Sequence, residues 1–245
     1  MIRKIITTSD GSKTIQIEVW NEQYHSIHGA IQEANHVFLK HGLRFFLESN
    51  RNTEGLSAQP EDSAIAPKAE PITILEIGFG TGLNAFLTLI EAEKQNQHIT
   101  YRGIEAYPVS TAEIEQLNYV ELISKNHADV FKKMHKVTWE VPHAITSKFQ
   151  LEKQQTFFQD IKATDAFDII YFDAFGARVQ PDLWTEAIFT IMYKALKNKG
   201  VLVTYSAKGS VRRAMLAVGF TVDRLPGPPG KREMLRGTKH STSDQ

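Results

Sequence analysis

Three glycines separate an apolar run from a helical stripe, and this feature constrains the fold of the chain most. Residues 72–77, Ile-Thr-Ile-Leu-Glu-Ile, are rich in β-branched side chains, which is typical of a buried strand. Gly78, Gly80 and Gly82 follow, and residues 83–90 then carry apolar side chains at helical spacing. A strand, a glycine loop and a helix predict a turn whose free backbone N–H groups face a ligand. The alternative is a tight turn without a ligand.

The spacing of the glycines narrows the class of ligand. It is G-x-G-x-G rather than the G-x-G-x-x-G of dinucleotide-binding loops, and no Gly-Lys-Ser/Thr run for a phosphate follows it. Glu76, at the end of the predicted strand, adds a carboxylate that repels phosphate and suits a cationic or amino-bearing ligand. The pattern E-x-G-x-G-x-G resembles motif I of the Rossmann-like methyltransferases. This resemblance implies S-adenosyl-L-methionine (SAM) as the cofactor.

Length and composition set further bounds on the class of protein. The chain has 245 residues, its apolar content is 42% and its formal net charge is zero, as in many single-domain globular proteins. It contains no cysteine, which excludes disulfides, thiolate metal sites and cysteine nucleophiles. No apolar run reaches the ~20 residues of a membrane helix, and the first residues lack the apolar core of a signal peptide. We expect a cytoplasmic protein that uses neither a membrane nor a metal.

A hairpin, a helix and a linker are predicted before the glycine loop. Asp10-Gly11 separates two runs with apolar or β-branched residues, 3–8 and 13–19, which favours a β-hairpin. Apolar residues at helical spacing predict a helix over 27–40, and residues 51–70, rich in Ser, Pro, Glu, Asp and Ala, predict a flexible linker. The predicted domains are an N-terminal hairpin-and-helix appendage, the linker, a main SAM-binding domain and a frayed tail: 1–50, 51–70, 71–239 and 240–245.

Strands and helices alternate through the main domain. Further strands are predicted at 99–104, 167–172, 201–205, 221–225 and 233–236, with a hairpin at 149–158 whose second arm enters the sheet. Helices are predicted at 109–124, at 182–197 and from residue 210. Repeated βα units predict a Rossmann-like α/β fold, with a mostly parallel twisted sheet and helices on both faces.

Four of the predicted strands end in a carboxylate: Glu76, Glu105, Asp160 and Asp173. Ligands of open α/β sheets bind beyond these strand ends. Glu105 lies roughly 20 residues beyond the glycine loop, where an acid that binds ribose hydroxyls is expected. The alternative is an exposed acid at a strand end. We expect Asp160 to lie beside the adenine and to accept a hydrogen bond from its exocyclic amine.

Asp173 is the predicted catalytic residue. In the expected strand order it lies next to the glycine loop, where it faces the transferred methyl group. Methyl transfer to an amine needs an unprotonated nitrogen aligned with the methyl carbon, and a carboxylate holds the amine and accepts its proton. The alternative role for Asp173 is a helix cap or a hydrogen bond within the loop.

The chain resembles the methyltransferase domain of the bifunctional tRNA-modifying MnmC proteins and its stand-alone relatives. The matching segments are Tyr24-His-Ser with the helix that follows to Leu39, Glu76–Asn84, Ile104–Pro108, Asp173–Phe175, Pro181–Trp184, Thr204–Ala207, Val211–Arg213, Gly219–Val222 and Gly230–Gly237. The glycine motif by itself indicates only a SAM-binding fold. The Asp-Leu-Trp segment together with Lys-Arg-Glu-Met-Leu is far more specific.

The resemblance implies SAM-dependent methylation of the aminomethyl nitrogen of 5-aminomethyl-2-thiouridine at the tRNA wobble position, which gives 5-methylaminomethyl-2-thiouridine. The implied partner is the anticodon region of tRNA. Because the chain ends before a flavin-dependent oxidoreductase domain, a separate enzyme is expected to supply the aminomethyl precursor. The run Gly176–Gln180 departs from the Ala-Pro pattern that the family often has there, so the shape of the acceptor loop stays open.

The resemblance also implies two sets of ligand-binding residues. The expected cofactor-binding residues are Tyr24, Glu76, Gly78, Gly80, Gly82, Asn84, Glu105 and Asp160. The expected tRNA-binding residues are Phe175, Trp184, Arg212, Lys231, Arg232 and Glu233. Basic residues exceed acidic ones over 201–245, which favours phosphate contacts, and the two aromatic rings suit stacking on a flipped base. The alternatives are a solvated basic face and, for Trp184, packing in the core.

Two other functions stay open at this point. A small-molecule amine methyltransferase or an aminopropyl transferase would act on a free amine without RNA. A non-catalytic RNA-binding module would not bind SAM, although the intact glycine loop and its acids argue against it.

Overall fold

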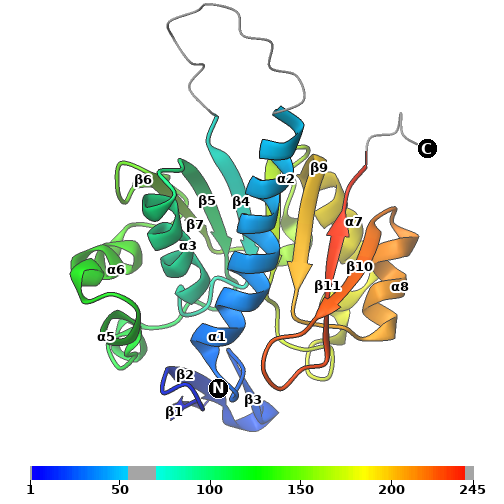
Figure 1. Ribbon diagram of the computed structural model, residues 1–245. Helices are drawn as coiled ribbons and strands as arrows, with labels where there is room; N and C mark the ends of the chain where they lie inside the picture. Colours follow the sequence, from blue (N-terminus) through cyan, green and yellow to red (C-terminus); the bar gives the residue numbers. More distant parts are fainter. Residues whose placement is uncertain (1, 55–69, 241–245) are drawn as a thin grey trace, which may run out of the picture.

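The computed structural model describes residues 2–54 and 70–240 of the chain. A small antiparallel sheet lies at its N-terminal end, below the main body in Figure 1. Its strands are β1 (Arg3–Thr7), β2 (Lys13–Ile17) and β3 (Glu22–Gln23), with the 3-10 helix η1 (Glu18–Trp20) between the last two. The hairpin around Asp10-Gly11 is therefore confirmed.

The main sheet has eight strands within the described residues. In chain order they are β4 (Ile72–Ile77), β5 (Ile99–Ile104), β6 (His143–Ala144), β7 (Phe149–Gln154), β8 (Phe167–Phe172), β9 (Leu196–Thr204), β10 (Thr221–Pro226) and β11 (Glu233–Thr238). Their spatial order is β10-β11-β9-β8-β4-β5-β7-β6. The strands from β9 to β7 are parallel, whereas β11, β10 and β6 pair antiparallel with their neighbours.

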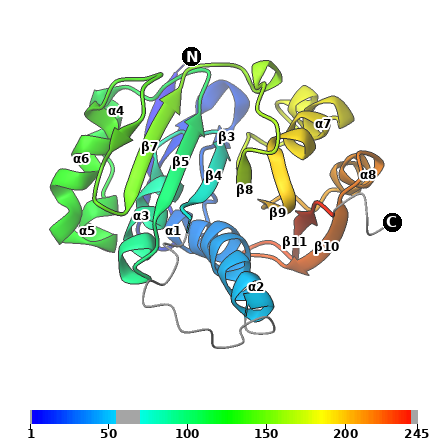
Figure 2. The same cartoon turned by 90° about the horizontal axis from the view of Figure 1, so that it is seen from above.

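Helices cover both faces of the main sheet (Figure 2). They are α1 (Ala30–Ala34), the π-helical segment η2 (Asn35–Arg44), α2 (Phe45–Glu54), α3 (Leu83–Lys94), α4 (Thr111–Ile114), α5 (Tyr119–Ile123), η3 (Lys125–His127), α6 (Ala128–Lys136), η4 (Phe158–Asp160), η5 (Pro181–Trp184), α7 (Glu186–Ala195) and α8 (Gly209–Ala217). The long helix α1–η2–α2 shares one core with α3, and α7 and α8 share the other core. The predicted α/β fold is confirmed.

The long helix begins in the predicted appendage and packs along the main sheet. Phe38 and Leu43 are buried in the same core as Ile74 of β4. Gly42 lies so close to the sheet that a Cβ atom would be 3.0 Å from a ring carbon of Tyr171. Residues 51–54 are helical rather than part of a linker, and the rest of the predicted linker, 55–69, lies outside the described residues. The division of the chain at residue 50 stays a prediction.

Three element predictions in the main domain differ from the structure. Phe149–Gln154 is a strand in its own right, parallel to β5, and its hairpin partner is the preceding strand β6. The reason is Lys153, which reads as polar but is buried, because its ammonium donates to the carbonyl oxygen of His135 at 2.9 Å and lies 4.9 Å from the ring centre of Trp139.

The helix predicted over 182–197 is also shorter than expected. It divides into η5 and α7 and ends at Ala195, because Leu196 is already paired with Phe167 of β8. The helix predicted over 109–124 likewise divides, into α4 and α5. Of the predicted tail, residues 241–245 lie outside the described residues.

Candidate functional site

A cavity of about 480 Å³ lies beyond the carboxyl ends of β4, β5 and β8. Its floor contains Gly78 and Gly80, and Glu105 and Asp173 stand on either side of them. Residues 20–28, together with Arg3, form a roof that comes from the N-terminal sheet. The cavity is therefore enclosed between the main sheet and the small sheet, at the edge where open α/β folds bind ligands.

The glycine loop needs glycine for two separate reasons. Gly78, Gly80 and Gly82 have φ angles of +89°, +48° and +72°, in the left-handed region that other residues rarely adopt. A Cβ atom on Gly78 would lie 2.7 Å from the carbonyl oxygen of Asp173, and one on Gly80 would lie 2.9 Å from the Tyr24 ring. Gly82 is buried and does not line the cavity. The loop thus packs closely against the segment after β8 and against Tyr24 of the roof.

Glu105 is anchored by two backbone amides, one in the glycine loop and one in the segment after β5. One carboxylate oxygen accepts from the Gly80 N–H at 3.0 Å, and the other accepts from the Tyr107 N–H at 2.9 Å. Lone pairs remain on both oxygens, so the carboxylate can also accept from two neighbouring hydroxyl groups. This geometry suits the ribose role that we predicted for Glu105.

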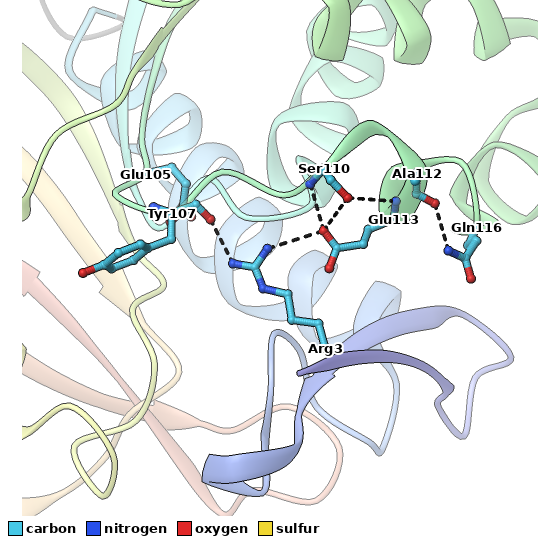
Figure 3. A network of polar contacts seen from close by, with 7 residues as sticks. All are labelled: Arg3, Glu105, Tyr107, Ser110, Ala112, Glu113 and Gln116. Atoms are coloured by element: carbon cyan, nitrogen blue, oxygen red, sulfur yellow. Dashed lines mark hydrogen bonds and ion pairs between the residues drawn. The ribbon is translucent and has the colours of Figure 1, made fainter. Parts of the chain in front are cut away.

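The roof is fastened beside Glu105 by Arg3 of β1 (Figure 3). The Arg3 guanidinium donates to the Tyr107 carbonyl oxygen at 3.0 Å and to the Glu113 carboxylate at 3.4 Å. Glu113 in turn completes a capping box with Ser110 at the start of α4. The roof, Glu105 and α4 therefore belong to one hydrogen-bonded network.

Asn84 joins two carboxyl groups below the cavity. Its amide nitrogen donates to Glu76 at 2.9 Å and to Asp173 at 2.8 Å. Glu76 is completely buried and does not line the cavity, and burial raises its pKa well above the ordinary value. The structure therefore does not bring Glu76 or Asn84 to the cavity as direct cofactor ligands, and it makes Asn84 the group that orients Asp173.

Asp173 lines the end of the cavity away from Glu105. We call this end the acceptor end, and it is lined by Asp173, Phe175, Tyr205, Glu33 and Lys231. Burial raises the pKa of Asp173 to about 7. The nearby charge of Glu33 adds to this rise, whereas the Asn84 hydrogen bond and the charge of Lys231 oppose it. A carboxyl group with such a pKa can bind and release a proton near neutral pH.

Aromatic rings surround the same end of the cavity. Phe175 packs edge-on against Trp20 and Tyr24, with ring centres 5.6 Å and 4.9 Å apart. Trp184 does not reach the cavity: it is buried against Phe172, and its indole N–H donates to the Phe175 carbonyl oxygen at 2.8 Å. The prediction that Trp184 stacks on a substrate base is therefore wrong, and its role is to hold the Phe175 loop.

Four other predicted residues are not brought to the cavity: Asp160, Arg212, Arg232 and Glu233. Asp160 lies in η4 rather than at a strand end and faces a separate hollow, whereas its neighbours Phe158 and Gln159 line the cavity. Arg232 is 91% exposed and lies 3.6 Å from Glu233. Lys231 does line the cavity, where it is paired with Glu33.

Sequence reasoning missed Arg3, Trp20, Glu33 and Phe158, all of which line the cavity. Three of them lie in or near the roof, a region to which the hairpin alternation and the Tyr24 segment of the resemblance pointed without naming these residues. Within the described ranges, the structure has no group of His, Asp and Glu side chains that could hold a metal ion. In the same ranges, no helix is long and apolar enough to cross a membrane.

The residues of the cavity fit SAM. A glycine loop at the start of α3, a fixed carboxylate for a diol and further carboxylates for a positively charged group are the donor set that this cofactor needs. Glu105, the loop at Gly78 and Gly80, and the side chains of Tyr24 and Phe158 would hold it. A phosphate-bearing cofactor would instead meet the negative charge of Glu105 and Asp173.

Residues 118–240 match the model of a family described as S-adenosyl-L-methionine-dependent methyltransferase. The chain is similar to the tRNA 5-methylaminomethyl-2-thiouridine biosynthesis bifunctional protein MnmC of Campylobacter fetus, with 29% identity over 187 residues, which cover 71% of this chain and 30% of that protein. The same protein of Cupriavidus metallidurans is 26% identical over 230 residues, which cover 88% of this chain and 31% of that protein. The chain thus spans about a third of the length of these relatives.

Two solved structures share the fold. The crystal structure of MNMC2 from Aquifex aeolicus matches with a TM-score of 0.74 and 21% identity, and it covers 99% of this chain and 73% of that one. Spermidine synthase from Thermotoga maritima matches with a TM-score of 0.55 and 16% identity, and it covers 97% and 68% of the two chains.

Proposed function

Because the chain belongs to the family of S-adenosyl-L-methionine-dependent methyltransferases, we propose that it methylates the aminomethyl nitrogen of 5-aminomethyl-2-thiouridine at the tRNA wobble position. The predicted enzyme class and the SAM cofactor are confirmed by the family. The proposed product is 5-methylaminomethyl-2-thiouridine, the compound that the name of the MnmC relatives contains. In this proposal the reaction takes place in the cytoplasm, on the anticodon region of tRNA.

The observation that carries the proposal is the position of Asp173. It lies against the glycine loop, since its carbonyl oxygen would touch a Cβ atom on Gly78 at 2.7 Å, and its carboxyl group faces the acceptor end. SAM, when bound, supplies a methyl group on a positively charged sulfur. Asp173 can then hold the acceptor amine at that place and take its proton, because its pKa is about 7. Glu105 and the loop fix the position of the cofactor, which converts the reaction into a well-oriented transfer.

Exposed basic residues at the carboxyl edge of the sheet support an RNA partner. We call four of them the basic edge: Arg178, Lys208, Arg213 and Arg232. All four side chains are exposed. Arg178 lies in the loop after β8, Lys208 lies between the end of β9 and α8, Arg213 lies in α8, and Arg232 lies in the turn between β10 and β11. These segments are adjacent at the carboxyl edge of the sheet. Positive charge along one edge of a site suits the phosphates of an RNA strand.

The aromatic residues of the acceptor end support a base as the substrate. Phe175 and Trp20 are half-buried, and both line the cavity. In many RNA-binding sites, an unpaired base that is turned out of its stack packs against aromatic rings of this kind. In this proposal another enzyme makes the aminomethyl group, because transfer of a methyl group to nitrogen requires an amine that is already on the base.

A free amine is the second candidate substrate. Four carboxylates line the cavity, Glu22, Glu33, Glu105 and Asp173, and a small cationic amine without RNA would be attracted to the same wall. A small-molecule amine methyltransferase or an aminopropyl transferase would use the cavity in this way. The test below separates these substrates.

The proposal is tested with labelled SAM and tRNA from cells that lack this activity but carry the aminomethyl group. After the reaction, the tRNA is digested and the nucleosides are separated. Label in 5-methylaminomethyl-2-thiouridine is the expected result. Label in another nucleoside would keep the methyltransferase class and overturn the acceptor, and label only in added free amines would favour the second candidate.

A further inference from the structure

Glu33 and Lys231 form an ion pair in the wall of the acceptor end, although 198 residues separate them in the chain. Glu33 lies in the first turn of α1 and is only 7% exposed. One of its carboxylate oxygens accepts from the Ser26 N–H at 2.8 Å, and the other accepts from the Lys231 ammonium. Lys231 comes from the turn between β10 and β11, so the pair ties the roof segment to the far end of the sheet.

The pair is also connected to the Asp173 loop. The Lys231 ammonium lies 3.9 Å from the ring centre of Tyr205. The hydroxyl group of the same tyrosine donates to the carbonyl oxygen of Ala174 at 2.8 Å, immediately after Asp173. Glu33, Lys231, Tyr205 and Asp173 all line one cavity. Two hydrophobic side chains could connect α1 with the β10–β11 turn equally well, because a buried ion pair is often no more stabilising than such a contact. The presence of two charges at this place therefore needs an explanation.

Polar groups reach Asp173 from every element packed against it. They are Asn84 of α3, Glu76 of β4, Tyr101 of β5, Glu33 of α1, Lys231 of the β10–β11 turn and Tyr205 after β9. Burial raises the pKa of Glu76, Tyr101 and Tyr205, which favours the uncharged form of each. The charged side chains that act on Asp173 within the acceptor end are Glu33 and Lys231.

We propose that Glu33 and Lys231 are a positioning pair that sets the charge of the acceptor end, so that Asp173 carries its only uncompensated negative charge. The inference rests on the proposed function, in which the acceptor arrives as an ammonium ion. One ammonium then neutralises one carboxylate. In the step that follows, an N–H bond of the ammonium breaks, an O–H bond forms on Asp173, and the electron pair stays on nitrogen as the nucleophile. No other reactant is needed.

Opposite effects of the two partners distinguish this role from simple packing. The positive charge of Lys231 favours the ionised form of Asp173, and the negative charge of Glu33 disfavours it. Lys231→Met therefore removes a favourable charge and leaves Glu33 unpaired, which moves the Asp173 titration to higher pH. Glu33→Gln removes an unfavourable charge, keeps the shape of the side chain, and moves the titration to lower pH. We expect each displacement to be about 1 pH unit.

The titration is measured by NMR on the full-length chain with ¹³C-labelled aspartate carboxyl groups. Asp173→Asn identifies the Asp173 signal, and melting temperatures establish that each variant is folded. Lys231→Arg keeps the charge and is expected to leave the titration within about 0.3 pH units of the wild type. Lys239→Met is the matched control, because Lys239 is paired with Asp165 at 2.8 Å and does not line the cavity.

Movement in opposite directions supports the proposal, and the pH at which the methylation rate is half-maximal is then expected to move in the same way. Movement in one direction for both variants, or no movement in either, overturns it and leaves the pair a structural contact. If one variant does not fold, the direction in which the Asp173 titration moves in the other variant, compared with Lys231→Arg, still decides whether the pair controls Asp173. Absence of methyl transfer to tRNA in the wild type would contradict the proposed function, whereas the NMR titration would still report whether the pair controls Asp173.

Discussion

The guanidinium group of Arg3 donates to the backbone carbonyl oxygen of Tyr107 at 3.0 Å, although 104 residues separate them in the chain. The N–H of the same tyrosine donates to Glu105, the acid that also accepts from the glycine loop. A single residue thus lies between the roof and the floor of the cavity (Figure 3). Arg3 of the roof and Glu105 are therefore linked through the backbone of Tyr107.

Arg3→Ala is expected to weaken SAM binding by about 3- to 10-fold. The variant loses one hydrogen bond and a half-buried ion pair, which together are worth about 0.5–1.5 kcal/mol. Lys4→Ala is the control, because Lys4 lies next in the same strand but is exposed and pairs with Glu18 inside the roof. Isothermal titration calorimetry measures both. Equal affinities for the two variants would show that the Arg3 network does not support the cofactor site.

Asp173→Ala is expected to lower the single-turnover rate of methyl transfer by at least about 100-fold, the usual effect of losing a general base. SAM affinity should stay within a few-fold of the wild type, because Glu105 and the glycine loop are unchanged. Asp129→Ala, which removes an exposed acid from α6, is the control and should leave both quantities unchanged.

The rate of the wild type should depend on pH in a defined direction. Only the ionised form of Asp173 accepts a proton, and its pKa is about 7. The single-turnover rate should therefore rise with pH up to about 7 and become constant above it. A rate that is independent of pH between 5.5 and 8.5 would exclude Asp173 as the proton acceptor.

Comparison of Gly78→Ala with Gly11→Ala separates the cost of a positive φ angle from the cost of a steric clash. Both glycines have positive φ angles, +89° and +82°, so each substitution should cost about 1–2 kcal/mol of unfolding free energy. Only at Gly78 does the new methyl group meet backbone, at 2.7 Å from the Asp173 carbonyl oxygen, whereas nothing lies within 4 Å at Gly11. Denaturant unfolding and SAM titration should show a larger loss of stability and no detectable SAM binding for Gly78→Ala alone.

Arg213→Gln tests the basic edge as an RNA contact. The slope of log KM for tRNA against log salt concentration should fall by about one for each phosphate contact that is lost. Lys132→Gln is the control, because Lys132 is exposed on α6 and lies outside the basic edge. SAM affinity should be the same in both variants. An unchanged slope for Arg213→Gln would place the RNA elsewhere on the protein.

The floor of the site could be predicted because its signals are local. Residues 72–94 contain a complete strand, loop and helix, and Glu105 and Asp173 each follow a strand of clear apolar pattern. Position at a strand end was sufficient for these acids, since parallel strands bring their carboxyl ends together. Asp160 was misplaced for the same reason: the strand assumed before it was β7, which ends at Gln154.

The pairings within the acceptor end could not be predicted, although Asp173, Phe175 and Lys231 were named, because these contacts join distant parts of the chain. Nothing near Glu33 indicates that its partner is Lys231, and Trp184 looks like a stacking residue until Phe172 and Phe189 are found around it. The length of the long helix was also underestimated, because its π-helical middle part shifts the apolar side chains out of the 3.6-residue period. Long-range pairing, rather than local preference, decides these details.

The pairing of Glu33 with Lys231 has a consequence for biosynthesis. A nascent chain that has left the ribosome only as far as α8 already contains the glycine loop, Glu105, Asp173 and the whole roof. It lacks β11, which pairs with β9, and it lacks the lysine that neutralises Glu33. Such a chain lacks one partner of the ion pair in the wall of the acceptor end. The acceptor end is therefore completed only after the β10–β11 segment has been synthesised and has folded onto β9.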